Sequence, residues 1–419
     1  DPAEKKSINE RPTTNTDAYD FYLRGIEYDS RGPAREDVHN SVEMFRRATE
    51  LDSNFAQAWA RFSIGRSGEY WFFYDRSEAA LSEAKAAADR ALRLRPDLPE
   101  PHVALGYYYY WAKLDYDRAL KEFALAQERQ PNNGDLFLAI ASVDRRQGRW
   151  AQAVVDFQKT AQLSPRSIDA VGNLSQTYSL VRKYDLACAI ADRAIGIGPD
   201  VAFPRWLKLQ CLMGEDSLPQ ARAAAREALK AVGLVQMVGE APGVGAIGSF
   251  AVVPSFLLLE DSAYQPKVEQ LTVADLPDTL GLYRLKADMY RIQGRVKLEQ
   301  AYLDSARAVL EPKVKTHPDE ANFRALLGLV YARLGRKTEA VREGQTAVKL
   351  LPVSREAYRG ANMQTALALI YATVGMRPKA LEQLKYLLSI PCDISRGLLR
   401  HDPRWAGLRD DPKFQELIR

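Results

Sequence analysis

Residues 321–352 read ANFRALLGLVYARLGRKTEAVREGQTAVKLLP, and this pattern of apolar and small residues governs what the chain can fold into. Apolar residues recur at helical spacing on both sides of Gly335 and Arg336, which predicts two short antiparallel helices joined by a tight turn. The stretch ends at Pro352, which lies 34 residues after Pro318. The same interval separates three prolines further upstream, Pro131, Pro165 and Pro199. A fixed period of this length is typical of a repeat architecture.

Small residues return at fixed positions in each repeat, where two helices must approach each other closely. They lie 12, 8 and 5 residues before the closing proline. In the repeat that ends at Pro352 these positions hold Ala340, Gly344 and Ala347. In the repeat that ends at Pro199 they hold Ala187, Ala191 and Ala194. Each repeat is therefore predicted to be a helical hairpin.

The pattern resembles the tetratricopeptide repeat (TPR), whose consensus places Leu-Gly, Tyr, Ala, an aromatic residue, Ala and Pro at these spacings. In the unit that ends at Pro131, the consensus positions hold Leu105, Gly106, Ala119, Phe123 and Ala126. Three phrases are more narrowly similar to the TPR regions of bacterial signalling proteins: TTNTDAYDFYLRG (13–25), LPEPHVALGYYYYW (98–111) and LLSIPCDISRGLLRHDPRWAGLRDDPKFQEL (387–417). In that group the repeats follow a Ser/Thr kinase, an adenylate/guanylate cyclase or a winged-helix domain, often with a TolB-like segment.

The resemblance implies an all-α, right-handed TPR superhelical solenoid of about nine recognisable repeats, one degenerate hairpin and a C-terminal cap. We expect five parts along the chain: a polar arm (1–16), an N-terminal TPR array (17–233), a degenerate helical hairpin (234–279), a C-terminal TPR array (280–392) and a capping segment (393–419). The 34-residue period fades in the third part. Residues 236–279 are therefore predicted to be the least stable interior region.

Composition excludes several classes of protein. The 419 residues are 46% hydrophobic and 27% charged, which is ordinary for a folded protein. The net charge of +4 comes from 58 basic and 54 acidic residues, so we expect no nucleic-acid partner. The best candidate for a membrane span, residues 251–259, is short and contains Pro254, so we expect no span in this chain.

The three cysteines, Cys188, Cys211 and Cys392, form no CxxC motif, which excludes a dense disulfide framework and a zinc site. They leave the compartment open. We expect a cytoplasmic protein, with the periplasmic part of a membrane-anchored protein as the alternative. The sequence starts with Asp1 and Pro2, from which we expect a processed chain or a part of a longer protein.

No catalytic or metal-binding constellation is evident. The four histidines lie in distant segments and show no metal-ligand spacing, so we expect neither a metal site nor catalytic residues. Gly243, Gly245 and Gly248 spell G-x-G-x-x-G, but a dinucleotide site needs this motif within a βαβ unit. Helical hairpins are predicted on both sides instead. We therefore expect no cofactor and no enzyme activity.

An aromatic run in the third unit is the strongest candidate for a partner-binding surface. Tyr107 and Tyr110 are one helical turn apart and are predicted to share the concave face, flanked by Trp111, while Tyr109 takes the consensus core position. The corresponding surface of the next two repeats adds Leu138, Ser142, Arg145, Arg146 and Gln176. If Arg145 is exposed, it could hold the carboxylate of an acidic or C-terminal peptide. Packing between repeats and a solvated helix end are the alternative interpretations.

These features predict a protein–protein interaction scaffold or regulatory module of a bacterial signalling protein, which binds a peptide or partner domain in its concave groove. Two alternatives stay open. One is a ligand- or nucleotide-binding enzyme that uses the glycine-rich segment 239–248. The other is a self-assembly module, which would form a homo-oligomer.

Overall fold

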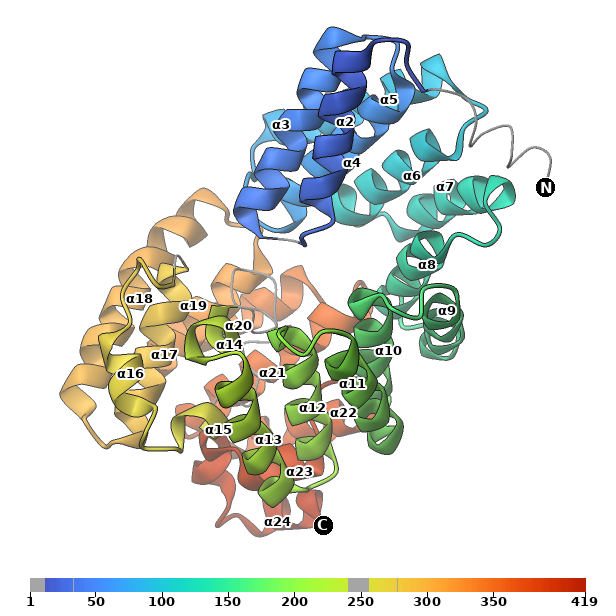
Figure 1. The fold of residues 1–419 in the computed structure, drawn as a ribbon. Coiled ribbons are helices and arrows are strands. Elements are labelled where there is room, and N and C mark those ends of the chain that lie inside the picture. The colour runs from blue at the N-terminus through green and yellow to red at the C-terminus, as the bar shows by residue number, and fades with distance from the viewer. Residues whose placement is uncertain (1–11, 33, 240–255, 277) are drawn as a thin grey trace. The chain divides into compact units, whose positions relative to one another are not determined.

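The computed structural model describes residues 12–32, 34–239, 256–276 and 278–419. These residues form helices joined by short turns, and none of them lies in a strand (Figure 1). The all-α prediction is thereby confirmed. Within the same ranges, no helix combines the length and the apolar character that a membrane crossing requires.

The chain divides into two compact units, Asp1–Val143 and Asp144–Arg419, and the division falls inside helix α8 (Gly134–Arg146). In the described part of unit 1, the helices before α8 form three hairpins. These hairpins are α2 (Thr16–Asp29) with α3 (Arg35–Leu51), α4 (Ala56–Trp71) with α5 (Glu78–Leu94), and α6 (Pro99–Tyr107), extended by the π-helical turn η1 (Tyr108–Lys113), with α7 (Tyr116–Arg129).

Unit 2 continues the pattern with six hairpins among its described residues. They are α8 with α9 (Trp150–Leu163), α10 (Ile168–Leu180) with α11 (Tyr184–Ile197), α12 (Ala202–Gly214) with α13 (Leu218–Ala231), α17 (Thr279–Ile292) with α18 (Val296–Thr316), α19 (Ala321–Arg333) with α20 (Lys337–Leu350), and α21 (Ala357–Thr373) with α22 (Arg377–Ser389). The C-terminal segment adds α23 (Arg396–His401), the 3-10 turn η2 (Pro403–Leu408) and α24 (Pro412–Ile418). This order of hairpins agrees with the predicted TPR-like array.

The turns within the hairpins lie where the sequence predicts them. Gly148 and Gly335 have positive φ angles of 75° and 78°, and Arg182 takes the same left-handed conformation at 60°. A left-handed residue ends the first helix and reverses the chain, and glycine adopts it without steric cost. The two glycines therefore mark the hairpin turns at this period.

Close helix contact explains the small residues of the repeat. A Cβ atom on Gly106 would lie 2.4 Å from the ring of Phe123, so any side chain there would push α6 away from α7. Ala119 and Ala126 of α7 are fully buried. Burial of such residues between paired helices, repeated along the chain, replaces the single core of a globular domain.

The region between α13 and α17 is less regular than the hairpins around it. Its described helices are short: α14 (Leu234–Gly239), α15 (Phe256–Leu259) and α16 (Gln265–Gln270). All four residues of α15 are buried. Nearly all of the glycine-rich segment, including Gly243, Gly245 and Gly248, lies outside the described residues.

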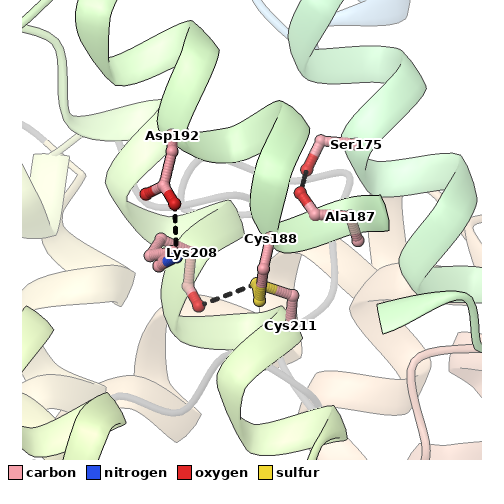
Figure 2. The surroundings of a disulfide bond; sticks show 6 residues. All are labelled: Ser175, Ala187, Cys188, Asp192, Lys208 and Cys211. Carbon is pink, nitrogen blue, oxygen red and sulfur yellow. Dashed lines mark hydrogen bonds and ion pairs between the residues drawn. A yellow bond between two sulfur atoms is a disulfide. The ribbon is translucent and has the colours of Figure 1, made fainter. Parts of the chain in front are cut away.

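A disulfide bond joins two neighbouring hairpins of unit 2. Cys188 of α11 and Cys211 of α12 are bonded, and their Cα atoms are 5.5 Å apart (Figure 2). Nearby, the Lys208 Nζ donates to the Asp192 carboxylate at 2.7 Å between the same two helices. The third cysteine, Cys392, is a buried thiol, and burial raises its pKa to about 12. One covalent bond and one ion pair thus fasten α11 to α12.

Candidate functional site

The predicted aromatic surface contains both packed and accessible rings. Tyr110 is only 4% exposed and packs against Trp71, with ring centroids 5.4 Å apart. Tyr107 and Trp111 are half-buried and contact each other at 4.3 Å. The prediction that Tyr110 shares the accessible face with Tyr107 is therefore wrong. The π-helical turn η1 changes the helical register after Tyr107, so spacing one α-helical turn apart no longer places two residues on one face.

Tyr109 packs as a structural residue. Its half-buried ring contacts a core cluster that includes Ala60, Ala88 and Leu105. Further along the chain, Leu138 and Ser142 are half-buried residues of α8. Neither position decides between packing and partner binding.

Charged side chains lie on the first helices of successive hairpins in unit 1. The Arg61 guanidinium of α4 bonds to the Asp29 carboxylate of α2 at 3.3 Å, and these side chains are 39% and 37% exposed. Burial nevertheless raises the pKa of Asp29, against the opposing effect of Arg61. Burial, followed by the charge of Asp135, also raises the pKa of Tyr107. Groups that solvent reaches, but that protein surrounds, are typical of an inward-curving surface.

Glu100 of α6 carries an unsatisfied polar atom in the same electrostatic environment. Its Oε2 is buried and has no hydrogen-bond partner among the described residues. Burial raises the pKa of Glu100, and the charge of Arg61 partly opposes this. We call Asp29, Arg61, Glu100 and Tyr107 the first-helix face of unit 1. A buried carboxylate oxygen without a donor is costly, so this face is suited to receive an N–H donor.

Arg145 lies in the interior of unit 2. It is 4% exposed, and its guanidinium donates to Asn173 at 2.8 Å, Gln176 at 3.0 Å and Thr177 at 3.3 Å. The guanidinium carbon also lies 5.0 Å from the centre of the Phe157 ring. The prediction that Arg145 is exposed in the free protein is wrong. Its hydrogen bonds hold α8 against α10.

The start of α21 packs against the residues next to Arg145. Glu356 is fully buried and pairs with Arg359 at 2.6 Å and with Arg146 at 3.5 Å. Gln176 donates to the Tyr358 hydroxyl at 3.1 Å. Arg146 and Gln176 are thus buried in an ionic cluster (Arg146, Glu356 and Arg359 with Tyr358) instead of forming a partner-binding surface. The residues of this contact are 182 to 210 positions apart in the chain, which no local pattern reveals.

The ionic cluster sets the charge state of Glu356. Burial alone would raise the pKa of this carboxyl group, but the charges of Arg146 and Arg359 outweigh burial and hold the pKa below its ordinary value. Glu356 is therefore ionised at neutral pH. Removing this charge would leave two buried guanidinium groups without their shared partner.

The C-terminal segment packs on α10 and α12 within unit 2. The Arg182 guanidinium donates to the carbonyl oxygens of Leu387 at 3.0 Å and Ile394 at 3.4 Å. A Cβ atom on Gly397 would lie 2.2 Å from the Met213 carbonyl oxygen, so α23 approaches the backbone of α12 as closely as glycine permits. The last residues therefore cover α12 as well as following α22.

Asp393 provides a pH-dependent element of this contact. Burial raises its pKa to about 6, although Gln210 donates to its Oδ1. The folded-state pKa thus lies above the ordinary value of about 3.9, so the folded state disfavours the ionised form. This group contributes most to stability below its ordinary pKa, and the contribution is lost as pH rises through about 6.

Asp393→Asn should therefore stabilise the protein at neutral pH by at least about 1 kcal/mol, since one pKa unit corresponds to about 1.4 kcal/mol. Urea unfolding at pH 7 and at pH 5 would measure the gain, which should shrink at the lower pH. Asp410→Asn, whose carboxylate is 71% exposed, is the matched control and should show no such gain. A loss of stability in Asp393→Asn at pH 7 would contradict the interpretation.

Known proteins share the helical-repeat character of this chain at low identity. No family model matches. A curated relative, the Protein CTR9 homolog of Arabidopsis thaliana, is 23% identical, and the match covers 76% of this chain and 33% of the relative. The chain thus spans about a third of the length of that relative.

Three solved structures illustrate the similarity of fold. PilF of Pseudomonas aeruginosa is 17% identical over 51% of this chain and 91% of its own, with a TM-score of 0.39. YrrB, described as a TPR protein with an unusual peptide-binding site, is 20% identical over 49% and 96%, with a TM-score of 0.29. The human IFIT1 dimer with m7Gppp-AAAA is 14% identical over 78% and 71%, with a TM-score of 0.46.

The class of protein follows from the hairpins themselves. Nine described hairpins carry left-handed turns and small residues at the predicted TPR spacing. This chain is a TPR-like helical-repeat protein.

Proposed function

We propose that the chain is a protein–protein interaction scaffold or regulatory module of a bacterial signalling protein, and that the first-helix face of unit 1 binds its partner. The observation that carries this proposal is the buried Glu100 Oε2, which has no hydrogen-bond partner among the described residues. Tyr107 supplies accessible apolar area in the same environment. An extended peptide would bring both the apolar contact and the missing donor.

The charges of the first-helix face favour a partner segment with a basic residue. Burial raises the pKa of Asp29 and Glu100, so both carboxylates lack full stabilisation of their charged forms. A lysine or arginine side chain of the partner would supply that stabilisation through a charge-assisted hydrogen bond. This chemistry replaces the acidic or C-terminal peptide expected from Arg145, which is buried.

Peptides selected from a phage-displayed library on the full chain would test the proposal. Calorimetry on the selected peptides should show binding weakened about ten- to a hundredfold by Glu100→Gln, because a hydrogen bond to a charged group contributes roughly 1.5–3 kcal/mol. Tyr107→Ala should weaken it as well. The matched controls are Glu128→Gln and Tyr386→Ala, which change exposed residues on second helices. Equal affinity in all four variants would remove the first-helix face from consideration.

The compartment is a second part of the proposal. Disulfides persist in oxidising compartments and are rare in the cytosol. The bond between Cys188 and Cys211 therefore favours the periplasmic alternative over the cytoplasm. Under this proposal the chain would be the periplasmic part of a membrane-anchored protein. A protein-only partner stays a prediction from the low net charge, and light scattering would detect self-assembly.

A further inference from the structure

Unit 2 encloses a cavity whose walls are rich in arginine. The cavity has a volume of about 50 Å³ and lies among α17, α19, α21 and η2. Its charged lining consists of Arg284, Arg291, Arg333 and Arg404, together with Asp288, which is the one acidic residue of the described lining. Apolar side chains complete the wall. The position of four guanidinium groups around one small space calls for an electrostatic explanation.

Ion pairs at the rim fix two of the guanidinium groups. Arg333 contacts Asp288 at 2.5 Å and Glu299 at 2.7 Å. Arg404 contacts the fully buried Asp402 at 2.5 Å. These carboxylates orient the arginines from behind, as the supporting residues of a preorganised site do.

The remaining positive charge is poorly accommodated in the folded chain. Burial lowers the pKa of Arg284 to about 10, and the charges of Arg404 and Arg333 lower it further against the effect of Asp288. Burial followed by the charge of Arg333 also lowers the pKa of Arg291. Because these bases bind protons less tightly when folded, their charge costs stability at neutral pH, and this cost disappears only as pH rises through about 10.

The cavity has room for a small polyatomic ion. A site for one water molecule needs roughly 10–15 Å³, so a volume of about 50 Å³ accommodates several water-sized groups. Guanidinium groups are planar donors whose geometry matches the oxygens of phosphate and carboxylate. With four arginines and one carboxylate in the described lining, a doubly charged ion fits better than a singly charged one.

We propose that this cavity binds a phosphate group, either as free phosphate or carried by a partner molecule. The site lies within unit 2 and does not depend on the first-helix face of unit 1. Binding would offset the repulsion among Arg284, Arg333 and Arg404 and would fasten η2 to α17 and α19. The expected consequence is a more stable C-terminal array when phosphate is bound.

Thermal unfolding of the full chain at pH 7 tests this inference. Inorganic phosphate should raise Tm in a saturable manner, whereas sodium chloride at the same ionic strength should not. O-phospho-L-serine in a parallel titration distinguishes the two sources: saturable binding shows that a partner-borne phosphate can enter, and its failure restricts the site to the free ion. An equal response to chloride would overturn the proposal and indicate screening alone.

Two single variants locate the effect. Arg284→Gln and Arg291→Gln should each weaken phosphate binding at least tenfold by calorimetry. Arg291 is exposed at the surface end of the site, so its replacement leaves the interior intact. Arg377→Gln is the matched control, because this arginine pairs with Asp410 at the surface away from the lining. Unchanged phosphate affinity in both folded variants would show that the ion binds elsewhere and would overturn the assignment.

Discussion

Glu356→Gln should destabilise the protein by roughly 3–5 kcal/mol, because removing one member of a buried ion pair leaves the others uncompensated. The substitution keeps the size of the side chain and removes only its charge. Glu356 is fully buried, and both Arg146 and Arg359 depend on it. Urea unfolding at neutral pH, followed by circular dichroism, would measure the loss.

The pH dependence of this effect has a definite sign. The folded-state pKa of Glu356 lies below its ordinary value, so the charge contributes stability above the ordinary value. This contribution is lost as pH falls, and the wild type and Glu356→Gln should converge in acid. Asp192→Asn is the control, since it removes a charge that is 59% exposed and should cost no more than about 1 kcal/mol. Similar losses in the two variants would disprove the ionic cluster.

Loss of the disulfide should cost roughly 2–4 kcal/mol, mainly because the cross-link restricts the unfolded chain. The bond closes a loop of 23 residues between α11 and α12. Dithiothreitol should therefore lower Tm of the wild type. Thiol titration of the unfolded, unreduced protein should find one free thiol per chain, that of Cys392.

Cysteine variants separate this effect from general reduction. Cys392→Ala should remain sensitive to dithiothreitol, because its disulfide is intact. A variant that combines Cys188→Ala with Cys211→Ala should be insensitive and should resemble the reduced wild type. Three free thiols in the unreduced wild type would contradict the bond and, with it, the proposed periplasmic compartment.

The local elements of the fold are predictable because hairpins are made by neighbours in sequence. The left-handed turn at Gly335 and the glycine that faces Phe123 both follow from residues within one repeat. The π-helical turn after Tyr107 was not predictable in this way. It depends on how Tyr110 packs against Trp71 of the preceding hairpin.

The sequence alone determined the helical class, the 34-residue period and the hairpin turns, since each depends on spacing along one short segment. Only the tertiary structure showed that Arg145 and Arg146 are buried, and that α21 packs where a partner was predicted. It also brought Arg284 and Arg404 to one cavity. The physical reason is that burial and charge neutralisation arise from contacts between distant repeats, whereas the consensus pattern reports only the packing within a repeat and onto its neighbours.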